Sequence, residues 1–116
     1  MKSKNISDDV FRFIMRLPME DFGGLTIKML ADHFNVSRCH LSRTFHADCG
    51  MMLTTFIKRQ KLLRAERILV EKNSLTVKEL ASHLGYSDSQ YFIARFKEQW
   101  GESPGRYRKL SADLAE

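Results

Sequence analysis

Two stretches of the sequence repeat one another: residues 25–37 read LTIKMLADHFNVS, and residues 75–87 read LTVKELASHLGYS. Seven of the thirteen aligned positions are identical, and three others stay apolar in both copies. After one inserted residue the match resumes, with Leu41 equivalent to Phe92 and Phe45 equivalent to Phe96. Such self-similarity indicates that the chain contains two copies of one structural unit.

The first half of each copy is typical of an amphipathic helix. Thr26 and Thr76 occupy N-cap positions, and Glu79 follows Thr76 by three residues, as a capping box requires. Apolar residues then recur at i, i+3, i+4 and i+7, which gives each helix one apolar face. These residues are Ile27, Leu30, Ala31 and Phe34 in the first copy, and Val77, Leu80, Ala81 and Leu84 in the second.

A tight turn and a second helix complete each copy. Asn35 and Gly85 take the turn, because both residue types tolerate a left-handed backbone. Ser37 and Ser87 are predicted to cap the second helices at their N-termini, and a glycine ends each of them. The second helices are therefore expected over about residues 37–48 and 88–99, ending at Gly50 and Gly101.

Residues 53–71 (LTTFIKRQKLLRAERILVE), between the copies, contain neither glycine nor proline and are rich in helix formers. At 1.5 Å per residue they predict a rod about 30 Å long. Its apolar residues are expected to pack on both subdomains: Leu53, Phe56, Ile57, Leu63, Ile68 and Leu69. Its basic residues are expected in solvent: Lys58, Arg59, Lys61, Arg64 and Arg67.

The ends of the chain add two more helices. One is predicted over Asp8–Leu17, before Pro18, and the other begins at Pro104. The sequence thus predicts an all-α fold of about seven helices, with two helix-turn-helix subdomains (1–52 and 72–116) joined by the connecting helix 53–71. Core-facing residues at the two ends are expected to be Val10, Phe11, Phe13, Ile14, Tyr107 and Leu110.

Composition limits the classes of protein to which this chain can belong. An apolar fraction of 43% in 116 residues fits a compact helical chain. No apolar run approaches the ~20 residues that span a bilayer, and no secretory segment follows Met1, so we expect no membrane partner and a cytoplasmic location. The net charge of +5 is compatible with nucleic acid if folding gathers the basic residues on one surface.

The sequence does not favour a metal site or catalysis. Cys39 and Cys49 are too few for a secreted disulfide framework and predict reduced thiols. On one helix, Cys39 and His46 lie two turns apart, about 10 Å, and His46 with Cys49 supplies only two ligands. We therefore expect no metal and no cofactor. Without a glycine-rich phosphate loop or a nucleophile–base pair, we also expect that the protein is not an enzyme.

A helix-turn-helix unit binds DNA when its second helix is exposed. Arginine bonds guanine, glutamine bonds adenine, and isoleucine contacts the thymine methyl group. Because successive major-groove faces lie ~34 Å apart, a rod of nearly that length lets one monomer address two adjacent turns. The residues expected to read bases are Arg38, Cys39, Ser42, Arg43 and His46 in the first helix, and Ser89, Gln90, Ile93 and Ala94 in the second, with Asp88 on the same exposed stripe.

The alternative is a helical protein-interaction module that does not bind DNA, with the second helices or a methionine-rich surface contacting protein. Methionines at helical spacing more often fill gaps in a core. The two copies, the basic charge and the length of the rod favour DNA. The methionines concerned are Met15, Met19, Met29, Met51 and Met52.

Over about residues 7–110 the sequence resembles the DNA-binding domain of the AraC/XylS family of bacterial transcription regulators. The resemblance is carried by LADHFNVSRCHLSRTFHADCG and by ELASHLGYSDSQYFIARFKEQWGESPGRYRKL. The second stretch is the more specific, with GYSDSQYF, FK, G-x-SP and YR in order. The resemblance implies seven helices, two major-groove readers, and activation or repression through contacts with RNA polymerase. Family members often carry an N-terminal effector-binding or dimerisation domain, which is therefore a candidate partner.

The resemblance also implies roles for single residues. Cys39, Ser42 and Arg43 match the positions where the first reading helix approaches bases. Ala94 departs from the family pattern, since many relatives carry arginine there, and this predicts weaker base reading by the second helix. The residues implied or expected to contact the DNA backbone are Ser37, His40, Ser87 and Tyr91.

Overall fold

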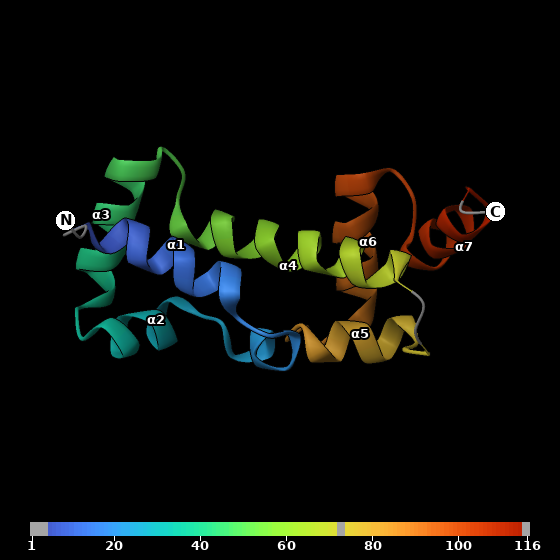
Figure 1. Ribbon diagram of the computed structural model, residues 1–116, viewed down its shortest axis with the longest axis horizontal. Coiled ribbons are helices and arrows are strands. Elements are labelled where there is room, and N and C mark those ends of the chain that lie inside the picture. Colours follow the sequence, from blue (N-terminus) through green and yellow to red (C-terminus); the bar gives the residue numbers. More distant parts are fainter. Residues whose placement is uncertain (1–4, 72–73, 115–116) are drawn as a thin grey trace.

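The computed structural model describes residues 5–71 and 74–114, and these residues form helices joined by turns, with no strand among them (Figure 1). The predicted all-α fold with two helix-turn-helix units is confirmed, with a short 3₁₀ helix, η1, in addition. The remaining residues of the predicted subdomains, 1–4, 72–73 and 115–116, lie outside the described residues. The elements are α1 (Ile6–Arg16), η1 (Met19–Gly24), α2 (Ile27–Phe34), α3 (Arg38–Cys49), α4 (Leu53–Val70), α5 (Val77–His83), α6 (Ser89–Trp100) and α7 (Pro104–Leu114).

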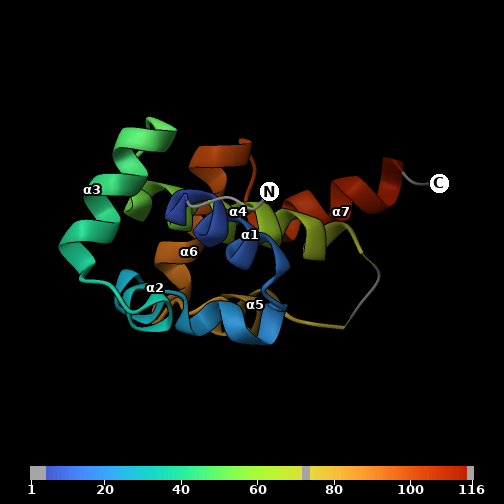
Figure 2. The ribbon, with the colours of Figure 1, turned by 60° about the vertical axis from the view of Figure 1, so that its left-hand side comes forward.

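The connecting helix α4 organises the molecule, which measures 46 × 32 × 24 Å. Its 18 residues correspond to a length of about 27 Å. Helices α2 and α3 lie at one end of α4, and α5 and α6 lie at the other (Figure 1). In Figure 2, turned by 60°, α3 and α6 again run nearly parallel, and α7 packs against α6. None of the helices in the described ranges combines the length and the apolar character needed to cross a membrane.

Several helix ends lie where the local signals predict them. The Thr26 hydroxyl accepts a hydrogen bond from the Met29 amide at 3.1 Å, and Thr76 and Glu79 form the capping box. Asn35 adopts a left-handed backbone with φ 58°, which ends α2 and opens the turn. The helices α3 and α6 end at glycines with positive φ, as expected: Gly50 and Gly101.

Several side chains predicted to be buried are exposed. Helix α1 begins at Ile6, because Asn5 caps it, and Phe11 is 45% exposed, although its ring lies 5.8 Å from that of Phe56. On α4, Leu62 takes the buried position and Leu63 is 39% exposed, since neighbouring residues of a helix point to different faces. Leu110 of α7 is also exposed.

The two units share a core. Arg64 of α4 was expected in solvent, but its Nη1 donates a hydrogen bond to the Leu17 carbonyl at 2.9 Å, and its guanidinium lies 4.2 Å from the centre of the Phe22 ring. Burial, with the nearby charge of Arg67, lowers the pKa of Arg64. Two residues further along α4, Glu66 accepts a hydrogen bond from the Tyr107 hydroxyl at 2.7 Å, which holds α7 in place. Helix α4 is therefore bonded to segments on both sides of it.

A second bridge between the units runs through two glycines. Helix η1 packs against α5, and the two lie side by side in both views (Figures 1 and 2). Gly85, in the turn between α5 and α6, has φ +90°, and a Cβ there would lie 2.7 Å from the Gly23 carbonyl oxygen. The backbones of η1 and of the second turn therefore touch, which fixes the second unit against the first independently of α4.

We expect Gly85→Ala to destabilise the protein more than Gly50→Ala. Both residues have positive φ, a conformation that costs alanine about 1–2 kcal/mol. A Cβ at Gly50 meets nothing within 4 Å, whereas at Gly85 it meets the backbone of Gly23, so Gly85→Ala should cost at least about 1 kcal/mol more. Urea denaturation measures both free energies of unfolding, and equal losses would show that the contact between the units contributes nothing.

Candidate nucleic-acid interface

Helix α3 is held rigidly by its inner face. Leu41 and Phe45 are buried, and the Phe45 ring lies 5.3 Å from that of Phe56 on α4. On the side of α1, the Ser7 hydroxyl donates a hydrogen bond to Asp48 Oδ2 at 2.8 Å. Because α3 is fixed on both α1 and α4, its outer residues are presented in a defined orientation.

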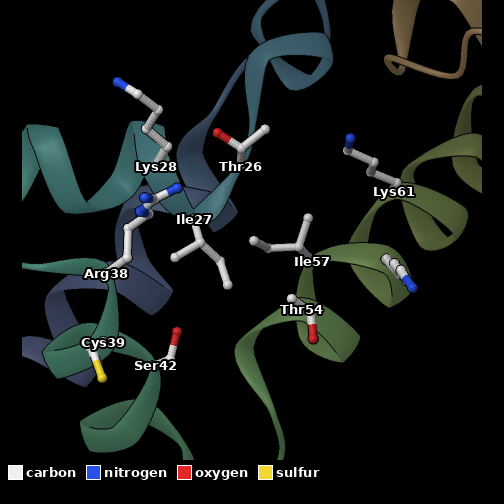
Figure 3. Close-up of a pocket in the computed structure, with 10 residues that line it drawn as sticks. Thr26, Ile27, Lys28, Arg38, Cys39, Ser42, Thr54, Ile57 and Lys61 are labelled. Atoms are coloured by element: carbon white, nitrogen blue, oxygen red, sulfur yellow. The ribbon is translucent and has the colours of Figure 1, made fainter.

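The five residues predicted to read bases from α3 line two adjoining hollows between α3 and the first turns of α4. One hollow has a volume of ≈ 620 Å³ and the other of ≈ 300 Å³. Arg38 lines the first, Arg43 lines the second, and Ser42 lines both. Figure 3 shows Ser42 and Arg38 of α3 on the opposite side of the larger hollow from Thr54 and Lys61 of α4. Cys39 borders both hollows, and His46 borders the second.

The exposed polar groups of α3 are available to a ligand. Arg43 Nη2 lies 3.3 Å from Cys39 Sγ one turn earlier, a weak contact with a neutral sulfur. Neither Arg38, Arg43 nor His46 pairs with a carboxylate in the described part of the chain. Two guanidinium groups of α3 therefore border the hollows without counter-charges.

Helix α6 is anchored in the same way but starts differently. Phe92 and Phe96 are fully buried, with ring centroids 5.9 Å apart. The N-cap is Asp88, whose Oδ1 accepts a hydrogen bond from the Gln90 amide at 2.9 Å, so the prediction that Ser87 caps this helix is wrong. A carboxylate accepts this bond well and is also favoured at a helix N-terminus by the helix dipole.

The outer face of α6 carries little positive charge. Gln90 and Ala94 are exposed, whereas Ser89 and Ile93 are half-buried, with Ile93 packed against the core. Arg95 pairs with Glu98 at 2.9 Å. Since α3 begins with Ser37 and Arg38 while α6 begins with the Asp88 carboxylate, the two faces differ in electrostatic attraction for an anion.

The residues predicted to contact the DNA backbone lie near the starts of α3 and α6. The Ser37 hydroxyl accepts a hydrogen bond from the His40 amide at 3.0 Å, so it acts as the helix cap, and the His40 side chain is exposed. Ser87 is exposed, and the Tyr91 ring is 48% exposed. The Arg95 guanidinium lies 5.3 Å from the centre of the Tyr91 ring, and this contact limits the movement of the ring.

Tyr86 lies in the second turn, between α5 and α6. Its ring lies 5.0 Å from Phe92 and 6.0 Å from the Lys61 ammonium of α4. Burial, with the neighbouring Tyr91, raises the pKa of Tyr86 to about 12. The hydroxyl therefore stays protonated at neutral pH and does not add negative charge to this surface.

The two cysteines are free thiols, and both are exposed. Partial desolvation of the sulfur, with the charges of Asp48 and Asp8, raises the pKa of Cys49, which keeps this thiol protonated and weakly nucleophilic. In the described ranges, no group of three His, Cys, Asp or Glu side chains could hold a metal ion.

Sequence reasoning missed two residues of this surface, Lys58 and Lys61 of α4. Both were expected to be ordinary solvated charges, but they line the larger hollow together with Thr54. The spacing 54, 58, 61 follows i, i+4, i+7, so a shared helix face was visible in the sequence. What the sequence did not show is that this face lies beside α3.

A family model described as a helix-turn-helix domain matches residues 30–110. The chain belongs to this AraC-type helix-turn-helix family. The match includes most of the first repeated unit and all of the second, and the resemblance noted from the sequence is confirmed.

The AraC-type domain is similar to several bacterial proteins. It is 37% identical over 89 residues to the uncharacterized HTH-type transcriptional regulator YfiF of Bacillus subtilis (strain 168), which covers 77% of this chain and 28% of that protein. It is 32% identical over 87 residues to the bifunctional transcriptional activator/DNA repair enzyme AdaA of the same organism, covering 75% of this chain and 41% of that protein. The domain thus spans less than half the length of these relatives.

A solved structure has the same architecture. It is the DNA-binding domain of AdpA, a global transcriptional factor, in complex with a target DNA. The TM-score is 0.72 at 26% identity, and the similarity covers 93% of each chain.

Proposed function

We propose that this AraC-type domain binds promoter DNA sequence-specifically, with α3 and α6 in two adjacent turns of the major groove, and thereby regulates transcription. The observation that carries the proposal is the pair of nearly parallel, outward-facing helices α3 and α6, each anchored by two buried residues at opposite ends of α4. The AdpA domain, which is similar to this one over 93% of its length, forms a complex with a target DNA.

Within this function, the outer residues of the two helices have separate roles. Those of α3 border the hollows beside α4, and Arg43 has the two parallel donors that match a guanine edge. On α6, Gln90 is an adenine reader and Ile93 a contact for a thymine methyl. The proposed base readers are Arg38, Cys39, Ser42, Arg43, His46, Ser89, Gln90, Ile93 and Ala94, and the proposed backbone contacts are Ser37, His40, Ser87 and Tyr91.

Further parts of the function concern the whole regulator. We assign RNA polymerase as a protein partner, an N-terminal effector-binding or dimerisation domain as a further unit, and the cytoplasm as the location. The relatives are named as transcriptional regulators, and this chain covers only 28% and 41% of two of them. We assign the domain no catalytic role, because the matched region is the helix-turn-helix domain. The division at residues 52/53 and 71/72 stays a prediction.

The methionines do not favour the alternative, a protein-interaction module. Met19 and Met29 are half-buried and packed against the core. Met15 and Met52 are exposed, but they line two different hollows and so do not build one docking surface. A gel-shift assay on promoter fragments with excess competitor DNA distinguishes the two functions. A protein-interaction module would shift none of the fragments.

We expect Arg43→Ala to relax sequence preference in the half-site under α3, and Ala94→Ser to change little in the half-site under α6. Arginine on a guanine edge contributes about 1–3 kcal/mol of discrimination, and alanine at the equivalent place of α6 donates no hydrogen bond. The second half-site should therefore depend more on Gln90 and on DNA shape. Selection of binding sites from random DNA measures both preferences.

The matched control is Arg43→Lys, which keeps the charge but loses the bidentate fork. It should relax the guanine preference while leaving non-specific affinity nearly unchanged. If Arg43→Ala weakened binding to all sequences equally, Arg43 would be a phosphate contact. A stronger base preference under α6 than under α3 would overturn the predicted asymmetry.

A further inference from the structure

The larger hollow between α3 and α4 is lined by two cations of α4, Lys58 and Lys61, to which the proposed function assigns no role. Its floor is apolar, with Ile27 and Ile57 facing one another, and Lys61 and Arg38 stand on opposite sides of it (Figure 3). Lys58 completes the lining on the side of α4. An apolar floor with cationic walls suits a ligand that is itself apolar in part and anionic in part.

Three of the four cations that line the larger hollow lack counter-charges. Lys28, at the edge of the hollow, pairs with Asp32 at 3.0 Å. By contrast, Arg38, Lys58 and Lys61 pair with no carboxylate anywhere in residues 5–71 and 74–114. Lys61 is half-buried, and this burial lowers its pKa. A partly desolvated ammonium without an anion costs free energy, which a bound anion would recover.

A DNA duplex is long enough to extend along α4. The positions of Lys58 and Lys61 on this helix therefore matter for its binding. Thr54, Lys58 and Lys61 follow i, i+4, i+7 and therefore form one stripe along the helix. The stripe starts beside Ser42 of α3 and ends where Lys61 lies 6.0 Å from the Tyr86 ring, in the turn that leads into α6. It therefore runs from the first reading helix towards the second.

A duplex read in two adjacent major-groove turns presents a stretch of minor groove between them, bordered by the two phosphodiester strands. These strands are ridges of deoxyribose, which is largely apolar, and of phosphates, each with one negative charge. A hollow with an apolar floor and two lysines on its α4 side is complementary to such a ridge. The hydroxyls of Thr26 and Thr54 add hydrogen-bond donors along it.

We propose that the hollow between α3 and α4 seats the phosphodiester strand between the two half-sites, with Lys58 and Lys61 as its phosphate ligands. The inference rests on the proposed function and extends it: α4 is part of the DNA-binding surface as well as a spacer. Contacts to this strand hold the duplex in register on both reading helices. They carry no sequence information, because phosphates are alike at every base pair.

The test is the salt dependence of DNA binding by the double variant Lys58→Gln/Lys61→Gln. Removing two phosphate contacts should reduce the slope of log affinity against log salt by about 2. Affinity should fall for all sequences alike, and the preferred site should stay the same. The control is Arg67→Gln/Lys109→Gln, which removes equal charge. Arg67 lies half a helical turn around α4 from Lys58, Lys109 lies on α7, and this variant should keep the wild-type slope.

A second measurement locates the phosphates. Uncharged methylphosphonates in place of the phosphates between the half-sites should lower the wild-type slope as much as the double variant does, and should not lower that variant's slope further. A charge-conserving variant, Lys58→Arg/Lys61→Arg, should keep the wild-type slope. That result would show that the reduced slope of the Gln variant comes from lost charge and not from misfolding. A wild-type slope in the Gln variant, or an additive effect of the methylphosphonates, overturns the inference. Absence of site-specific binding by the wild-type domain would overturn the proposed function instead.

Discussion

Binding of duplex DNA by this domain is expected to weaken about 10³-fold when the salt concentration rises from 50 to 200 mM. The expectation follows from counterion release by about six phosphate contacts. The chain has a net charge of +5, and the unpaired cations Arg38, Lys58 and Lys61 line one hollow beside the proposed reading face. Fluorescence anisotropy with a labelled promoter duplex measures the affinity across this range.

The control for this titration is a duplex of scrambled sequence at the same salt concentrations. Its affinity should be lower throughout, but it should fall nearly as steeply, because the phosphate contribution does not depend on sequence. If log affinity were nearly flat against log salt, the domain would not be a duplex binder that spans two turns. That result would favour the alternative, a protein-interaction module that does not bind DNA.

Leu63→Pro should lower the free energy of unfolding by about 3 kcal/mol or more. Proline in a helix interior removes one backbone hydrogen bond and clashes with the preceding turn. Leu63 lies in the middle of α4 and is 39% exposed. Most of the expected loss of stability therefore comes from the backbone and not from lost side-chain packing. A bend there also changes the distance between α3 and α6, and the two-turn DNA footprint should shorten or disappear. Urea denaturation and DNase footprinting measure the two effects.

Leu63→Ala is the matched control, because it shortens the same exposed side chain and leaves the helix intact. Its cost should be a small fraction of that of proline, and its footprint should match that of the wild type. If α4 bent, the contact between Gly23 and Gly85 would also break. This adds to the free energy of unfolding that the proline variant loses. Unchanged stability and an unchanged footprint with proline would show that a continuous α4 is not needed.

The local structure could be read from the sequence because its signals act over three or four residues. The Thr26 and Thr76 caps, the left-handed Asn35 and the buried Phe45 all follow from neighbouring residues. The same short range explains one error. Ser87 and Asp88 are adjacent and both can cap a helix, and the choice of Asp88 shifted the start of α6 by one residue.

Burial was harder to predict from periodicity. Phe11, Leu63 and Leu110 stand at helical spacing from other apolar residues, yet all three are exposed. Spacing assigns a residue to a side of its own helix, but burial requires another element to cover that side. Leu62, not Leu63, is buried on α4, because the elements packed against α4 cover that side of the helix.

The sequence by itself determined the two copies of the unit and the helices within them, since repetition, capping and periodicity are local properties. Only the tertiary structure decided which distant residues meet. The contact between Gly23 and Gly85, the bond from Arg64 to Leu17, and the hollow that gathers Arg38, Lys58 and Lys61 join segments far apart in the chain. No local pattern encodes such a meeting, because it depends on how whole helices pack around a shared core.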